Sequence, residues 1–170
     1  FHARRQPVRH GRCDVSARVL LVTGSRALDK SPEAAQAGAI LNVIATTFAP
    51  TVIVAGDASG PDEWAIDLAV TRRIDTRIYA LDGSVRRADG TVLRQWAAML
   101  DGDRDARTWP LNRNAVMVRD AARIDGAAVL VLSLEAGWSA TKGTAHTVGR
   151  AERHGLAVTR VTFARERSRG

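Results

Sequence analysis

The sequence Ala127-Ala-Val-Leu-Val-Leu-Ser-Leu134 runs directly into Glu-Ala-Gly-Trp-Ser-Ala-Thr-Lys-Gly-Thr144. Its first part is a continuous apolar run of strand length, and its second part is rich in small residues. A helix-like stretch from Ala145 to His154 follows. Free N–H groups at such a helix start, together with the positive end of the helix dipole, favour an anion. We therefore predict a buried strand, a phosphate-binding loop and a helix.

The same order of strand, loop and helix occurs twice nearer the N-terminus. Continuous apolar strands that alternate with helices are typical of parallel sheets covered on both faces. We therefore predict the α/β class, with a single Rossmann-like doubly wound, mainly parallel five-stranded sheet and helices on both faces. The predicted strands are 18–23, 51–55, 77–81, 127–134 and 157–163. One predicted helix begins after residue 31, and the other three cover 63–73, 112–123 and 143–154.

The length of 170 residues and the 45% hydrophobic content fit one domain. We expect a flexible basic extension at 1–16, the Rossmann-like domain at 17–164 and a basic tail at 165–170. Residues 82–110 are rich in Asp, Gly and Arg and predict an irregular insertion, within which 92–100 is compatible with a short helix. Apolar runs stop far short of the roughly 18 residues of a membrane span. We expect a cytoplasmic protein without a membrane partner.

The net charge of +7 raises the hypothesis of nucleic-acid binding. Much of the positive excess lies near the two ends of the chain, and the rest is nearly balanced. We therefore favour solvated ends, and keep nucleic acid as a less favoured partner. The arginines concerned are Arg4, Arg5, Arg9, Arg12, Arg18, Arg165, Arg167 and Arg169.

Three small-residue loops follow predicted strands and should converge at the carboxyl edge of the sheet, where this class of fold binds ligands. These loops are 23–26, 56–62 and 139–144. In addition, a helix start at 113–114 either faces the same cleft or is exposed to solvent. Glycines allow close backbone approach, arginine and lysine suit phosphate, and aspartates suit ribose hydroxyls or a base edge. The candidate ligand-binding residues are Thr23, Gly24, Ser25, Arg26, Gly56, Asp57, Ser59, Gly60, Asp62, Arg113, Asn114, Ser139, Thr141, Lys142, Gly143 and Thr144.

Several common site types are absent from the sequence. Neither the P-loop pattern nor the G-x-G-x-x-G dinucleotide pattern occurs. The chain has a single cysteine, and its four histidines show no ligand spacing, so we expect no metal. We expect no required cofactor, apart from a bound nucleotide.

Four segments in order resemble the SLOG superfamily, and within it the YspA-like branch (DUF2493). They are Val19-Leu-Leu-Val-Thr-Gly-Ser-Arg26, Ala55-Gly-Asp-Ala-Ser-Gly-Pro-Asp62, Arg113-Asn-Ala-Val-Met117 and Ser139-Ala-Thr-Lys-Gly-Thr-Ala-His-Thr-Val148. The resemblance covers roughly 17–163. It implies a Rossmann-like fold related to DprA-type and LOG-type proteins, and a nucleotide or ADP-ribose-like ligand in the cleft formed by the loops.

The chain departs from that pattern at three single positions and in the glycine-rich loop, which here is Ser139-Ala-Thr-Lys-Gly-Thr144. Ser59 stands where the family has an arginine, and Asp57 stands where it has a second glycine. Thr147 follows the Gly-Thr pair where LOG-type enzymes carry the glutamate that takes part in N-glycoside cleavage. The carboxylate that the resemblance would make catalytic is therefore missing.

Three functions remain open on this basis. The favoured one is binding or sensing of a nucleotide or nucleotide-derived ligand, which needs no catalysis, so we favour a binding protein over an enzyme. The first alternative is a divergent nucleoside 5′-monophosphate N-glycosidase of the phosphoribohydrolase type. In it Asp62 or Asp57 replaces the missing glutamate and Arg113 holds the phosphate. The second alternative is DprA-like single-stranded nucleic-acid binding through the basic ends. Related folds self-associate through their helices, so a homo-oligomer is a further expectation.

Overall fold

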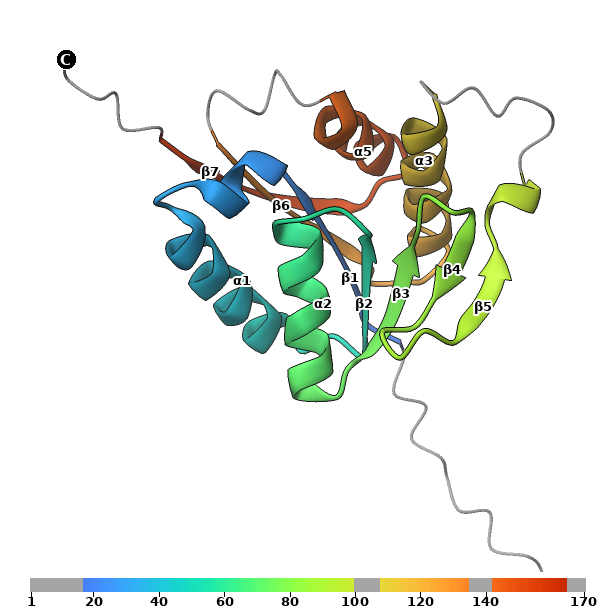
Figure 1. Cartoon of the computed structure of the whole chain (residues 1–170), viewed down its shortest axis with the longest axis horizontal. Coiled ribbons are helices and arrows are strands. Elements are labelled where there is room, and N and C mark those ends of the chain that lie inside the picture. The colour runs from blue at the N-terminus through green and yellow to red at the C-terminus, as the bar shows by residue number, and fades with distance from the viewer. Residues whose placement is uncertain (1–16, 100–107, 135–141, 165–170) are drawn as a thin grey trace, which may run out of the picture.

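The computed structural model of the chain describes residues 17–99, 108–134 and 142–164. One sheet runs through the molecule and carries helices on both sides (Figure 1). In chain order the elements are β1 (Val19–Gly24), the 3-10 helix η1 (Arg26–Lys30), α1 (Ala34–Phe48), β2 (Val52–Gly56), α2 (Pro61–Arg72), β3 (Asp75–Tyr79), β4 (Ser84–Arg86), β5 (Val92–Gln95), the 3-10 helix η2 (Ala97–Met99), α3 (Trp109–Ala121), β6 (Ala128–Leu134), α5 (Lys142–Arg153) and β7 (Ala157–Phe163).

The sheet has seven strands in the order β5-β4-β3-β2-β1-β6-β7. Strands β3, β2, β1, β6 and β7 pair in parallel, as predicted. Strands β4 and β5 are antiparallel additions at one edge. The prediction of a mainly parallel sheet is confirmed, and the number of five strands is wrong.

Both extra strands come from the stretch that we expected to be irregular. In residues 82–110 the chain makes β4, β5 and η2, and no α-helix forms among its described residues before α3. Trp96 anchors this stretch, because its ring is fully buried and its Nε1 donates to the carbonyl of Ala80 at 2.7 Å. Gly83, with a φ of 96°, makes the turn that begins β4, and its carbonyl accepts from the Trp96 amide at 2.8 Å.

Burial on both faces explains the continuous apolar strands. Along β1, Leu20 and Val22 face the cluster under α1 and α2, whereas Val19 and Leu21 face the cluster under α3 and α5. Successive side chains of a strand point to opposite faces, so both faces must be apolar when both are covered. None of the described helices is long and apolar enough to cross a membrane.

The end of β1 passes unusually close to its neighbours. The amide of Ser25 donates to the carbonyl of Leu132 on β6 at 3.0 Å. A Cβ at Gly24 would lie 2.1 Å from that same oxygen and 2.6 Å from Cγ of Pro61. Only glycine permits this approach. It draws together the carboxyl ends of β1 and β6, at the point where the order of the parallel strands reverses.

Candidate functional site

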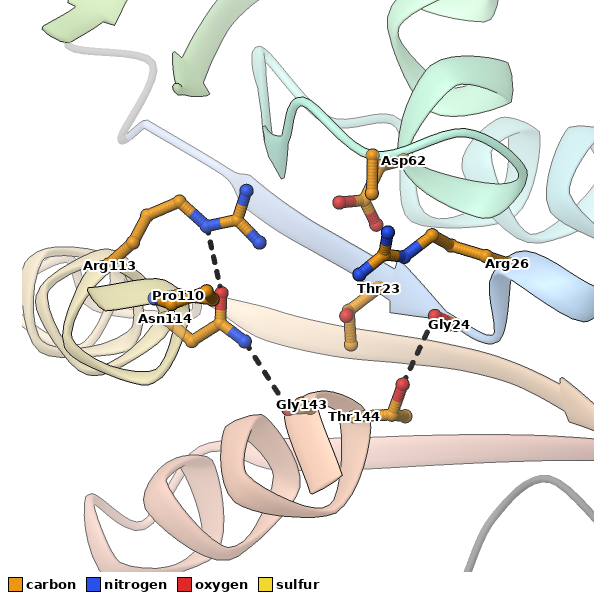
Figure 2. A pocket seen from close by; sticks show the side chains of 10 residues that line it. Thr23, Gly24, Arg26, Asp62, Pro110, Arg113, Asn114, Gly143 and Thr144 are labelled. Atoms are coloured by element: carbon orange, nitrogen blue, oxygen red, sulfur yellow. Dashed lines mark hydrogen bonds between the residues drawn. The ribbon is translucent and has the colours of Figure 1, made fainter. Parts of the chain in front are cut away.

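A polar pocket of about 200 Å³ lies at the carboxyl edge of the sheet (Figure 2). We call it the inner pocket. Four chain segments line it: the end of β1 with η1, the β2–α2 connection, the start of α3 and the start of α5. The lining residues are Thr23, Gly24, Arg26, Ala58, Asp62, Pro110, Arg113, Asn114, Gly143 and Thr144. Open α/β sheets bind ligands at this place, outside the strand ends and at the switch in strand order.

The end of β1 is joined to the start of α5. The hydroxyl of Thr144 donates to the carbonyl of Gly24 at 3.1 Å, which holds the first turn of α5 against β1. Ser25 is fully buried, and its hydroxyl oxygen accepts from the amide of Ala27 at 3.3 Å. Ser25 therefore caps η1 and does not line the inner pocket, although the sequence predicted it as a ligand contact.

Asp62 is a buried carboxyl in the first turn of α2. Burial raises the pKa of Asp62 from 3.8 to about 7, and the negative charge of Asp57 adds to the rise. The positive charge of Arg113 and backbone hydrogen bonds from Ala58 and Gly56 oppose it. A carboxyl group with this pKa carries a proton for about half of the time near neutral pH.

Gly56 is required behind this carboxyl group. A Cβ at Gly56 would lie 2.5 Å from Oδ2 of Asp62 and 3.0 Å from Cζ of Arg113. Any larger residue would therefore displace the carboxyl or the guanidinium from its present position. Neither Gly56 nor Gly60 lines the inner pocket, although both shape the β2–α2 connection. Gly60 has a φ of 84°.

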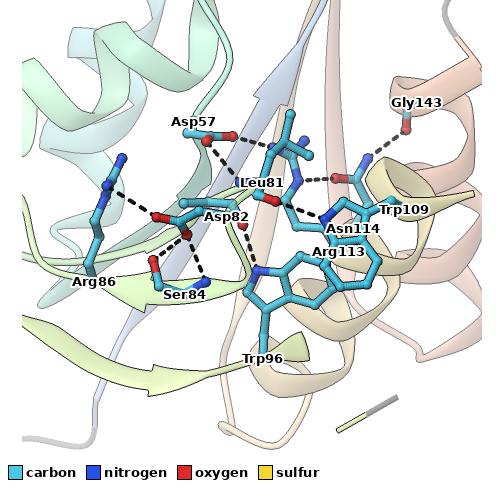
Figure 3. A network of polar contacts seen from close by, with 11 residues as sticks. Asp57, Leu81, Asp82, Ser84, Arg86, Trp96, Trp109, Arg113, Asn114 and Gly143 are labelled. Atoms are coloured by element: carbon cyan, nitrogen blue, oxygen red, sulfur yellow. Dashed lines mark hydrogen bonds and ion pairs between the residues drawn. The ribbon is translucent and has the colours of Figure 1, made fainter. Parts of the chain in front are cut away.

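Arg113 is held in a network that crosses the sheet edge (Figure 3). Its Nη1 donates to Oδ1 of Asp57 at 2.6 Å, and its Nε donates to Oδ1 of Asn114 at 3.0 Å. The side-chain nitrogen Nδ2 of Asn114 donates to the carbonyl of Gly143 at 3.3 Å. The backbone amide of Leu81 donates to Oδ2 of Asp57 at 2.9 Å. The guanidinium is thus fixed in place before any ligand arrives.

The charges around the inner pocket favour an anion when Asp62 is protonated. Arg26 is exposed and extends from η1 into the inner pocket, across from Arg113 (Figure 2). Arg113 is already paired with Asp57, so Arg26 supplies the net positive charge. The N–H groups in the first turn of α5 lack helical partners and add a partial positive charge. Guanidinium groups and helix N-termini are common phosphate ligands.

Some predicted site residues lie elsewhere. Asp57 and Ser59 line a neighbouring pocket and not the inner one. Ser139, Thr141 and the side chain of Lys142 lie outside the described residues, so their predicted phosphate contacts stay predictions.

Two lining residues were not predicted. Ala58 and Pro110 contribute to the wall of the inner pocket, and small or cyclic apolar residues in loops carry no chemical signal in a sequence. Within residues 17–99, 108–134 and 142–164, no three His, Cys, Asp or Glu side chains are placed to hold a metal ion.

Comparisons with known proteins show the fold and no more. No protein-family model and no curated protein matches the chain. The X-ray structure of DNA processing protein A (DprA) from Streptococcus pneumoniae is similar, with a TM-score of 0.54 and 20% sequence identity. The match covers 85% of this chain and 50% of that one, so the chain spans about half the length of its structural relative. The chain therefore has a Rossmann-like α/β fold similar to that of DprA.

Proposed function

We propose that the chain binds a nucleotide or a nucleotide-derived ligand through a phosphate group in the inner pocket. One observation carries the proposal: Arg26 and the fixed Arg113 face one pocket, beside the first turn of α5. These groups come from three separate segments and meet at the place where α/β sheets bind ligands. The phosphate would lie between the two guanidinium groups and the start of α5.

Asp62 has a distinct role in this proposal. When protonated, its carboxyl donates a hydrogen bond to a phosphate or ribose oxygen, whereas its ionised form repels phosphate. Binding of a phosphate group therefore favours the protonated form of Asp62, and affinity falls as the pH rises through about 7. Arg113 from α3, Arg26 from η1 and Asp57 from the β2–α2 connection are the charged groups around it.

Calorimetric titration with ribose 5-phosphate, AMP and ADP-ribose tests the proposal. Arg26→Gln removes an exposed cation that has no part in the Arg113 network, and we expect it to weaken binding about tenfold, as for one charge-assisted hydrogen bond. Arg150→Gln on the exposed face of α5 is the matched control, because it removes the same charge outside the inner pocket. Equal affinities of the two variants, or no binding of any of these ligands, would overturn the proposal.

Single-stranded nucleic-acid binding is the second candidate. What supports it is that the structure of similar fold belongs to a protein described as DNA-processing. The net charge of +7 adds to its support. Binding of an oligothymidylate that falls steeply with salt and is lost on removal of residues 1–16 would support this function. Salt-independent binding or no binding would exclude it.

Two further hypotheses concern the superfamily of the chain and an N-glycosidase activity. Membership of the SLOG superfamily and of its YspA-like branch rests on the four sequence segments alone. The N-glycosidase hypothesis rests on Asp62, whose raised pKa suits a general acid. Release of free base from AMP, abolished by Asp62→Asn, would support that activity, and an absence of released base would exclude it for AMP.

A further inference from the structure

The inner pocket is too small for a whole nucleotide. Its volume of about 200 Å³ lies below the range of about 300 to 1,000 Å³ that is usual for small-molecule sites. It can enclose a phosphate group and part of a sugar, while a base must lie outside it. A base site exists only if the chain binds a nucleotide, so the inference rests on the proposed function.

A second pocket of about 390 Å³ adjoins the inner pocket, and we call it the outer pocket. Ala58 lines both pockets, so they meet at the β2–α2 connection. The outer pocket lies between this connection, the first turns of α2, and strands β3 and β4. Besides Asp57 and Ala58, its lining consists of Ser59, Glu63, Ile66, Ile78 and Arg86.

The connection between the two pockets is held in place. Asp57 belongs to the outer lining, and its two carboxylate oxygens accept from Arg113 of the inner pocket and from the backbone of Leu81. The next residue along the chain is Ala58, whose methyl group takes little room. A ligand that spans both pockets would pass over this small side chain, with its sugar at the boundary.

The outer pocket has the chemistry that a nucleobase requires. Ile66 from α2 and Ile78 from β3 provide apolar surface for the face of a ring. Glu63 is exposed in the first turn of α2 and carries an acceptor for an N–H group of the base edge. Arg86 from β4 provides donors, and its ion pair with Asp82 is long, at 3.8 Å, and exposed.

We propose that the outer pocket holds the base of a nucleotide whose phosphate lies in the inner pocket. The carboxylate of Glu63 accepts from an exocyclic amino group, and Ile66 contacts the ring face. Adenine and cytosine carry such an amino group and uracil does not, because uracil has a carbonyl oxygen at the corresponding ring position. The site therefore prefers nucleotides with an amino-bearing base, and AMP binds more tightly than UMP.

Two substitutions in the outer pocket test this proposal by calorimetry with AMP, UMP and ribose 5-phosphate. Ile66→Trp fills the outer pocket and is expected to weaken AMP binding about tenfold or more, since the excluded base loses its apolar contact with Ile66 and Ile78. Ribose 5-phosphate has no base, so its affinity should stay unchanged, which also shows that the variant is folded. Val43→Trp, on the exposed side of α1, is the control for adding a tryptophan.

Glu63→Gln changes the surface of the outer pocket without filling it. It is expected to weaken AMP binding about three- to tenfold, as for the change from a charged to a neutral hydrogen-bond acceptor, and to leave UMP binding unchanged. If the chain binds ribose 5-phosphate and AMP, and neither substitution changes their relative affinities, the outer pocket is not the base site and the proposed function stands. If the unsubstituted chain binds none of the three ligands, the proposed function fails with it.

Discussion

Replacement of Asp62 by asparagine is expected to stabilise the chain at neutral pH and to remove part of the pH dependence of its stability. The pKa of Asp62 is about 7 in the folded chain, against 3.8 for an ordinary aspartate. The folded state therefore keeps a proton that the unfolded state releases between about pH 4 and pH 7. This group's contribution to stability is fully present below about pH 4, falls as the pH rises, and is lost above about pH 7.

The size of the effect follows from the same two values. A pKa difference of about 3 corresponds to about 4 kcal/mol, of which about 3 kcal/mol is lost between about pH 5 and pH 8. Asparagine is neutral throughout and keeps an oxygen that can accept the backbone hydrogen bonds from Gly56 and Ala58. The free energy of unfolding of the Asp62→Asn chain, minus that of the unsubstituted chain, should therefore increase by about 3 kcal/mol from pH 5 to pH 8. Other titrating groups are the same in both chains and cancel in this difference.

Urea unfolding followed by tryptophan fluorescence measures this difference, because the chain has four tryptophans. Asp67→Asn is the matched control, since Asp67 is an exposed carboxylate on the same helix. Its stability should follow that of the unsubstituted chain at every pH. A difference between the Asp62→Asn and unsubstituted chains that stays constant within about 1 kcal/mol from pH 5 to pH 8 would refute the reasoning. The carboxyl group would then not be desolvated as the structure has it.

Three further predictions concern packing and a buried hydroxyl. Gly24→Ala should destabilise the chain by about 3 kcal/mol and lower Tm by about 10 °C, because its Cβ meets the backbone oxygen of Leu132 at 2.1 Å. Gly38→Ala, inside α1 with nothing within 4 Å, should instead raise stability by about 1 kcal/mol, so Tm shifts of the same sign would contradict one of the two predictions. Tyr79→Phe removes the hydroxyl that donates to Asp120 at 2.8 Å and should cost about 1 to 3 kcal/mol in urea unfolding. An unchanged midpoint would show that this hydrogen bond contributes nothing.

The parallel part of the fold could be predicted because its strands are apolar on both faces. The runs at 18–23 and 127–134 became β1 and β6 with a shift of at most one residue at each end. The antiparallel edge could not be predicted, since β4 and β5 have only three and four residues. Every residue of β5 is exposed, so it shows no apolar alternation, and the buried Trp96 that anchors it is a single residue.

The inner pocket was largely foreseeable for a related reason. Loops that follow parallel strands emerge at one edge, so Arg26 and Asp62 had to approach one another, whereas the sequence left open whether Arg113 faces the same cleft. The roles of Ser25 and Asp57 could not be foreseen. A serine hydroxyl has several local backbone partners to choose from, and Asp57 pairs with an arginine 56 residues away. Such a pairing depends on how α3 packs on the sheet, and no local pattern encodes it.

The strand order also bears on how the chain folds during synthesis. Strand β1 is the first of the described strands to be made, yet it lies inside the sheet between β2 and β6. About 100 residues separate the end of β1 from the start of β6, which ribosomes take roughly 5 to 20 s to add. Throughout that time one side of β1 has unpaired N–H and C=O groups, and such an open edge pairs readily with other chains. The nascent chain is therefore most prone to aggregation through β1 before β6 has emerged, and pairing with β6 covers the open side of β1.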